Sequence, residues 1–170
     1  MSKTFLANYD SHELKTRLNS LIEVKSEDTL KNHFQQTMFF KNDRKVSGTI
    51  KKESFKIWFC DEIGGLTGMF YPIIEGTHKP NDDGLEIAFK SKPNIISRIF
   101  YVTMSAAMAY VVTFGIIIQE DNPIKYLFYR AIAGAVLFGL MMSLPTILYF
   151  KLTSDMKEYL IKELDLKKTK

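Results

Sequence analysis

Two long apolar runs dominate the second half of the chain. Residues 99–118 (IFYVTMSAAMAYVVTFGIII) and 131–150 (AIAGAVLFGLMMSLPTILYF) each contain 20 residues and no charge. A helix of that length is about 30 Å long, which matches the hydrocarbon core of a bilayer. Neither run keeps one face polar, as a helix on the surface of a soluble domain does. The pattern therefore predicts two membrane spans, at about 99–118 and 126–150. Two central helices of a soluble bundle are the alternative, which so short a chain could hardly enclose.

The connection between the runs, Gln119–Pro123, is too short for anything but an antiparallel hairpin. Pro123 suits the first turn of the second helix. After the second run, apolar residues recur on one helical stripe: Leu152, Met156, Leu160 and Leu164. We therefore expect the second helix to continue beyond the bilayer as an amphipathic extension.

The first half of the chain has shorter patterns. Asp10 or Ser11 can cap a helix in which Leu14, Leu18, Leu21 and Ile22 share a face, with Glu13 placed to reach back to the cap. A second short helix is expected over 28–35. Alternation of apolar and polar residues then predicts antiparallel strands at 37–41, 45–51, 54–60, 71–78 and 85–91, and the sequence PNDDG (Pro80–Gly84) predicts a turn between the last two.

These elements predict an α+β membrane protein. A small antiparallel β meander with an N-terminal amphipathic helix would form a soluble cytoplasmic domain over residues 1–97. The transmembrane helical hairpin would occupy 98–152, and an amphipathic cytoplasmic tail would follow over 153–170.

Charge refines the expected location. Residues 1–97 carry a net charge of +1 and residues 98–170 a net charge of +3, too little and too mixed for a nucleic-acid surface. Lys and Arg residues near the hairpin are concentrated on the side of both termini, which predicts cytoplasmic termini and an external Gln119–Pro123 loop. The first thirty residues lack the apolar core of a cleavable signal peptide. Cys60 is the single cysteine, so no intramolecular disulfide can form.

Candidate chemistry is sparse. His12, His33, His78 and Cys60 lack the close spacing that zinc ligands usually show, and two carboxylates follow Cys60, which disfavours a reactive thiolate. The glycines at 64, 65 and 68 lack the Lys-Ser/Thr pair of a phosphate-binding loop. The sequence therefore predicts no metal, no cofactor and no enzymatic activity.

Two groups of residues are candidates for contacts. Small residues recur every four positions in both apolar runs, a pattern that lets helices in lipid approach closely: Ala131, Ala135, Gly139 and Ser143 in the second, and Ser105, Ala109 and Thr113 in the first. They could pack within the hairpin, which we favour, or against another subunit. Trp58, beside Lys56, is either an exposed contact for a partner or lipid headgroups, or lies under the N-terminal helix.

Several short motifs resemble those of a group of small bacterial membrane proteins of unassigned function. They are G-x-I at 48–50, F-x-I at 55–57, P-x-x-x-G at 72–76 and L-x-I at 85–87, ahead of apolar spans. The resemblance covers residues 37–150. It implies a β-rich soluble domain before a two-span hairpin in a bacterial inner membrane, and it supplies no catalytic or binding residue.

The leading functional hypothesis is a non-enzymatic integral membrane protein whose cytoplasmic domain binds a partner protein, as an accessory subunit or an immunity-type protein. The alternative is an effector whose domain senses a ligand and whose spans oligomerise and permeabilise the membrane. The expected partners are the lipid bilayer and another protein or a second copy of the chain, and not nucleic acid.

Overall fold

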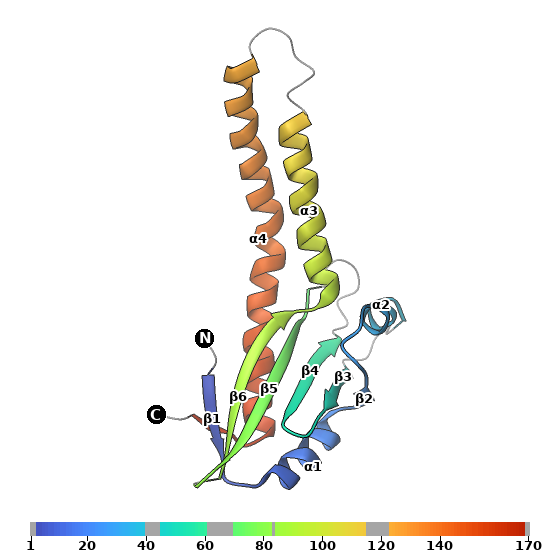
Figure 1. Ribbon diagram of the computed structural model, residues 1–170, viewed down its shortest axis with the longest axis vertical. Helices are drawn as coiled ribbons and strands as arrows, with labels where there is room; N and C mark the ends of the chain where they lie inside the picture. Colours follow the sequence, from blue (N-terminus) through green and yellow to red (C-terminus); the bar gives the residue numbers. More distant parts are fainter. Residues whose placement is uncertain (1–2, 40–44, 61–69, 83, 115–122, 169–170) are drawn as a thin grey trace.

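The computed structural model describes residues 3–39, 45–60, 70–82, 84–114 and 123–168. It is a mixed α+β structure built on one seven-stranded sheet with strand order β2-β3-β4-β5-β6-β1-β7 (Figure 1). The strands are β1 (Lys3–Ala7), β2 (Val24–Lys25), β3 (Lys45–Ile50), β4 (Ser54–Cys60), β5 (Pro72–Asn81), β6 (Gly84–Pro93) and β7 (Lys167–Lys168). The helices are α1 (Ser11–Leu21), α2 (Leu30–Phe39), α3 (Ile95–Phe114) and α4 (Pro123–Glu163).

The predicted meander is confirmed from β3 to β6, where each strand pairs antiparallel with the next. Three short strands extend it beyond the prediction. β1 pairs antiparallel with β6, β7 pairs with β1, and β2 runs parallel to β3. Gly84, in the turn after β5, has φ +130°, and a side chain there would meet the backbone carbonyl of Ala7 on β1. The turn therefore needs glycine for two independent reasons.

The helices of the first half depart from the prediction in one place. The Asp10 carboxylate accepts hydrogen bonds from the backbone N–H groups of His12 and Glu13, which confirms the expected cap of α1. The strand predicted at 37–41 is wrong, because α2 continues through Phe39. Residues 37–41 (TMFFK) form a short apolar run, which does not distinguish a strand from the last turn of a helix. Residues 40–44 lie outside the described part of the chain.

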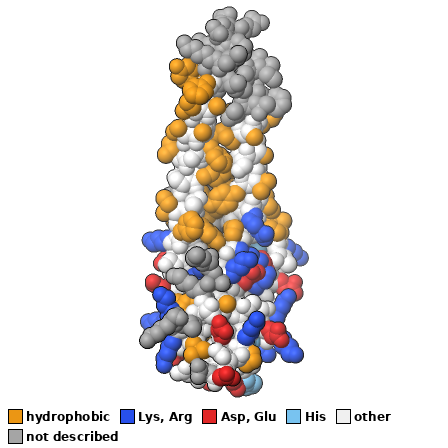
Figure 2. Space-filling model, turned by 60° about the vertical axis from the view of Figure 1, so that its left-hand side comes forward, with side chains coloured by type: hydrophobic (Ala, Val, Ile, Leu, Met, Phe, Trp, Pro, Cys, Tyr) orange, Lys and Arg blue, Asp and Glu red, His pale blue; other side chains and the backbone are white. Residues whose placement is uncertain are grey.

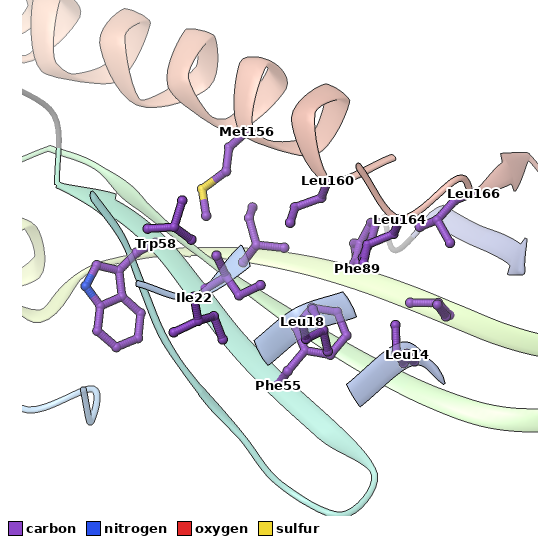
Figure 3. Close-up of a cluster of buried hydrophobic side chains, with 14 of the residues drawn as sticks. Leu14, Leu18, Ile22, Phe55, Trp58, Phe89, Met156, Leu160, Leu164 and Leu166 are labelled. Atoms are coloured by element: carbon purple, nitrogen blue, oxygen red, sulfur yellow. The ribbon is translucent and has the colours of Figure 1, made fainter. Parts of the chain in front are cut away.

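The core lies on one face of the sheet, which we call the inner face. α1 and the lower part of α4 both cover it (Figure 3). Side chains from the two helices, and from the residue that follows each helix, meet those of the strands in a cluster that is almost fully buried: Leu14, Leu18 and Ile22; Met156, Leu160 and Leu164; and Phe55, Ile57 and Phe89. Three of the four residues of the expected amphipathic stripe, Met156, Leu160 and Leu164, are therefore part of this core, whereas Leu152 is half-buried. α4 is continuous from Pro123 to Glu163.

α3 and the upper part of α4 project together from the sheet as a stalk, residues 98–114 and 123–150 (Figure 1). Many of its large apolar side chains are exposed, from Val102 at 70% to Ile132 and Ile99 at 48%. Apolar side chains extend over the stalk in Figure 2, and charged ones begin at its base. Each helix has one half-buried line, Tyr101, Met104 and Met108 on α3 and Ala131, Gly134, Phe138 and Met142 on α4.

Among the described residues, one helical segment, Ala131–Glu163, is long and apolar enough to cross a membrane by length and composition. The apolar part of α3, Ile95–Val111, falls short of that length. The mixed α+β architecture is thus confirmed, while the two-span hairpin stays a prediction. The predicted loop Gln119–Pro123 falls outside the described residues except for Pro123, which begins α4.

Candidate functional site

The other face of the sheet carries a compact charged cluster where α2 covers it. Lys56 on β4 is paired in register with Glu75 on β5. The Asp28 carboxylate, just before α2, accepts hydrogen bonds from the ammonium groups of Lys56 at 2.9 Å and Lys92 at 2.8 Å. Both lysines also contact Glu75, at 3.2 and 2.7 Å. Two lysines and two carboxylates thus neutralise one another across three strands and the start of α2.

His33 of α2 extends this cluster into the protein. Its Nε2 lies 3.0 Å from Asp28 Oδ1, and its Nδ1 lies 2.6 Å from the Tyr71 hydroxyl. Because an ionised carboxylate only accepts hydrogen bonds, we assign the proton to Nε2, and Tyr71 then donates to Nδ1. The imidazole is fully buried, and its centroid lies 5.0 Å from that of the Trp58 ring.

These contacts shift the pKa values of His33 and Asp28. Burial lowers the pKa of His33 and outweighs the opposite effect of Asp28, so the imidazole is neutral at pH 7. Burial disfavours the charge on Asp28, but the hydrogen bonds from Lys92, Lys56 and His33 together outweigh it and hold the pKa of this carboxyl well below its usual range. The pair is therefore a carboxylate and a neutral imidazole, not an ion pair.

Asn94 connects the same cluster to the stalk. Its amide Nδ2 donates to the Tyr71 carbonyl at 2.9 Å, and its Oδ1 accepts from the Ser97 backbone N–H at 2.8 Å, which caps the first turn of α3. We call Asp28, His33, Lys56, Tyr71, Glu75, Lys92 and Asn94 the junction cluster. It links α2, three strands and the base of α3.

The chemistry open to the junction cluster is limited by access. His33, Tyr71 and Asn94 are at most 3% exposed, and the Asp28 side chain is 10% exposed. A histidine held by a carboxylate resembles the base of a hydrolase, but its other nitrogen is occupied by a buried tyrosine. Both ring nitrogens of His33 are therefore engaged within the protein, and the geometry suits a rigid connection between domain and stalk.

Sequence reasoning missed this cluster. It considered His33 as a metal ligand, but its partners are a carboxylate five residues earlier and a tyrosine far along the chain. No short spacing rule finds such a set. The signal that the sequence offered was that Lys56 shares one face of its strand with Trp58, a residue type that is usually largely buried.

The structure corrects the expectation that Trp58 is an exposed contact for a partner. Its side chain is 0% exposed and lies under α2 against His33, not under α1. Lys56, on the same side of β4, is about one third exposed and engaged by Asp28 and Glu75. Sequence alternation placed Trp58 on the face opposite Phe55 correctly, but it could not show that a second helix covers this face.

The small-residue stripes also lie differently from the favoured interpretation. Only Ala131 is half-buried, whereas Ala135, Gly139 and Ser143 are exposed. A side chain added at Gly139 would meet nothing within 4 Å. Packing within the hairpin uses the line with Gly134, Phe138 and Met142 instead, because bulky side chains fill the space between α3 and α4. On α3, Ser105 and Ala109 are exposed, and the side chain of Thr113 lies outside the described part.

Among the described residues, no group of three or more His, Cys, Asp or Glu side chains is placed to hold a metal ion. The side chain of Cys60 and the glycines at 64, 65 and 68 fall outside that part of the chain. The absence of a cofactor and of an enzymatic activity stays a prediction.

No protein-family model, curated protein or solved structure matches this chain. The resemblance to small bacterial membrane proteins therefore gains no support from these comparisons.

Proposed function

We propose that α3 and α4 cross a bilayer as a two-span hairpin and that the protein is a non-enzymatic integral membrane protein whose α+β domain binds a partner protein. The observation that carries this proposal is the change in surroundings along α4. Its upper part exposes Val136, Leu140 and Ile147 by 56–66%, whereas Met156 and Leu160 lower down are at most 1% exposed.

Exposed apolar surface on this scale is costly in water, at about 25 cal/mol per Å². Soluble monomers rarely carry a continuous apolar patch of more than a few hundred Å². Lipid removes the cost for both stalk helices together. The proposal includes α3 because it runs beside α4, exposes Val102 and Val111, and leads into the uncharged residues up to 118.

The pairing of strands supports a common side for both termini. β1 and β7 pair through Phe5 and Lys168, so the two ends of the chain belong to the same domain. Any membrane crossed by the stalk therefore leaves both ends together. The Lys and Arg bias favours the cytoplasm of a bacterial cell for that side.

Support for partner binding comes from the sheet face that α2 only partly covers. Thr77 and Lys90 are exposed on this face, and Lys90 is paired in register with Glu75 of the junction cluster. An open sheet face held rigidly at a membrane is suited to docking a protein. Photo-crosslinking amino acids at Thr77 and Lys90 in cells test this, with Asn19 on the exposed side of α1 as the control position. The proposal requires a discrete adduct from the sheet positions; adducts no different from those at Asn19 would refute it.

The ligand-sensing effector is a second candidate, and two observations favour it. The stripe of Ala135, Gly139 and Ser143 faces away from α3, where another copy could pack in lipid. A pocket of about 270 Å³ between α1, β2 and β3 also lies against Ser26 and Glu27, directly before Asp28 of the junction cluster.

Membrane potential in cells distinguishes the two candidates. An effector should depolarise cells on overexpression, and Gly139→Leu should abolish the effect while Leu137→Ala preserves it. A partner-binding protein should leave the potential unchanged in all three cases.

A further inference from the structure

Among the described side chains of α2, two large apolar ones are exposed, Leu30 at 46% and Phe34 at 51%. Every other large apolar side chain that is similarly exposed in the described part of the chain belongs to the stalk. Leu30 and Phe34 are four residues apart, so they share one face of the helix. Single exposed apolar residues need no explanation, but a pair confined to one face at the base of the stalk does.

The direction of this face follows from Asn32. At ~100° per residue, Leu30 and Phe34 each lie about 200° around the helix from Asn32, on the opposite side. The Asn32 amide donates to the Glu27 carbonyl at 3.1 Å. Asn32 therefore faces the segment that precedes Asp28, and the two apolar side chains face away from it.

The position of Asp28 on the sheet then sets the orientation. Its carboxylate contacts Lys56, which is in register with Glu75. His33 instead packs on Trp58, two residues further along β4 toward the end of the sheet where β6 leads into α3. The Asn32 side of α2 thus faces down the sheet. Leu30 and Phe34 face the stalk end.

The placement of the whole helix agrees with this orientation. α2 contacts α3. In Figure 1 it is seen nearly end-on beside the base of α3, while α3 and α4 run along the long axis of the molecule. α2 therefore lies across the stalk axis, as a helix in the plane of a membrane surface would.

We propose that α2 is an interfacial membrane helix whose Leu30 and Phe34 enter the boundary between lipid headgroups and acyl chains. The inference rests on the proposed membrane insertion of the stalk and adds a second, lateral contact with the same bilayer. The occupant is lipid, because this apolar face is directed toward the stalk end and α2 contacts α3, whose exposed side chains include the apolar Ile99 and Val102. Lys31 and Gln35, both exposed, lie on the adjacent side, where headgroups and water would solvate them.

The junction cluster gives this contact a structural consequence. His33, one residue before Phe34, is hydrogen-bonded to Asp28 and Tyr71. Tyr71 is in turn held by Asn94 at the start of α3. The depth of α2 in the interface and the seating of α3 are therefore fixed by the same contacts.

Spin labelling of the full chain tests the proposal. Single cysteines at Phe34, Gln35 and Leu140 in a Cys60→Ser background carry a nitroxide, and the protein is reconstituted in vesicles of equal parts phosphatidylcholine and phosphatidylglycerol. Collision rates with oxygen, which concentrates in lipid, and with a water-soluble nickel chelate report the depth of each label. Leu140 reports the stalk, and Gln35 is the matched control on α2.

We expect the oxygen-to-nickel ratio at position 34 to exceed that at 35 several-fold and to remain below that at 140. Equal ratios at 34 and 35, with 140 in lipid, would overturn the interfacial helix and leave the proposed stalk insertion intact. A label at 34 shielded from both reagents would also overturn it, because protein would then cover the face. A water-exposed label at 140 would refute the membrane insertion itself.

Discussion

Replacing Asp28 by Asn is the sharpest perturbation of the junction cluster, because it removes a charge with almost no change of shape. Asn can still accept from His33 through its oxygen. Its amide group, however, would face the ammonium groups of Lys56 and Lys92, which now lie at 2.9 and 2.8 Å from the carboxylate. Two charge-assisted hydrogen bonds are lost, and the two lysine ammonium groups then face the amide N–H donors of the new asparagine.

A hydrogen bond to a charged group contributes about 1.5–3 kcal/mol. The lysine side chains are 25–31% exposed and keep Glu75 as a partner, so solvent and that carboxylate recover part of the loss. We therefore expect Asp28→Asn to lower the free energy of unfolding by about 2–3 kcal/mol at pH 7.

Pulse proteolysis in urea on the full chain in detergent measures this difference. Asp82→Asn, which removes an exposed carboxylate from the β5–β6 turn, is the control and should change stability by less than about 0.5 kcal/mol. Because the folded pKa of Asp28 is depressed, its contribution is complete above the ordinary pKa of about 3.9 and is lost as the pH falls through the folded value. The gap between wild type and Asp28→Asn should thus persist from pH 7 to about 5. A gap equal to that of the control, or one that closes by pH 6, would refute this account of the cluster.

Three further predictions use the same assay. Gly76→Ala should destabilise the domain by about 1–3 kcal/mol, because the added methyl group would meet the buried ring of Phe55; an unchanged midpoint would contradict the packing. Leu160→Ala should lower the free energy of unfolding by about 2–5 kcal/mol and Leu137→Ala should hardly change it. Equal effects of the two substitutions would contradict the packing of the end of α4 into the core. Below pH ~6.5 the His33 side chain of the unfolded chain takes up a proton, whereas the buried imidazole of the folded protein resists protonation, so the free energy of unfolding should fall by up to about 1.4 kcal/mol per pH unit. His33→Gln should remove that part of the pH dependence, and an unaltered slope would exclude His33 as its source.

Periodicity predicted the central strands because their alternation reflects a sheet with one fully buried face. Val46, Phe55, Ile57 and Phe89 are all on the inner face, as their spacing indicates. The continuity of α4 was likewise predictable, because its apolar stripe passes through the end of the second run without interruption.

The edge strands, and the packing of α2 on the second face of the sheet, were not predictable in the same way. β1 is short and gains its place only by pairing with β6, far along the chain. The burial of Trp58 depends on α2, which is held by Asp28 and His33 through contacts with separate strands. Such contacts depend on tertiary structure and leave no periodic trace in the sequence.

Lys56→Asp illustrates the difference in physical terms. From alternation alone, this change is expected to be tolerated on a solvent-facing position, in contrast to Ile57→Asp in the core. The structure places Lys56 between Asp28 and Glu75, so Lys56→Asp would bring three carboxylates together. Both variants should therefore destabilise the domain.

The crossing of the membrane by the stalk is tested most directly by labelling single cysteines in intact cells with a membrane-impermeant maleimide, in a Cys60→Ser background. The two informative positions are Gln119, which lies between α3 and α4 in the sequence, and Lys168 on β7. We expect the protein in the membrane fraction, a cysteine at 119 that reacts in intact cells, and one at 168 that reacts only after lysis. A soluble protein, or two positions that react alike before lysis, would contradict the two-span hairpin.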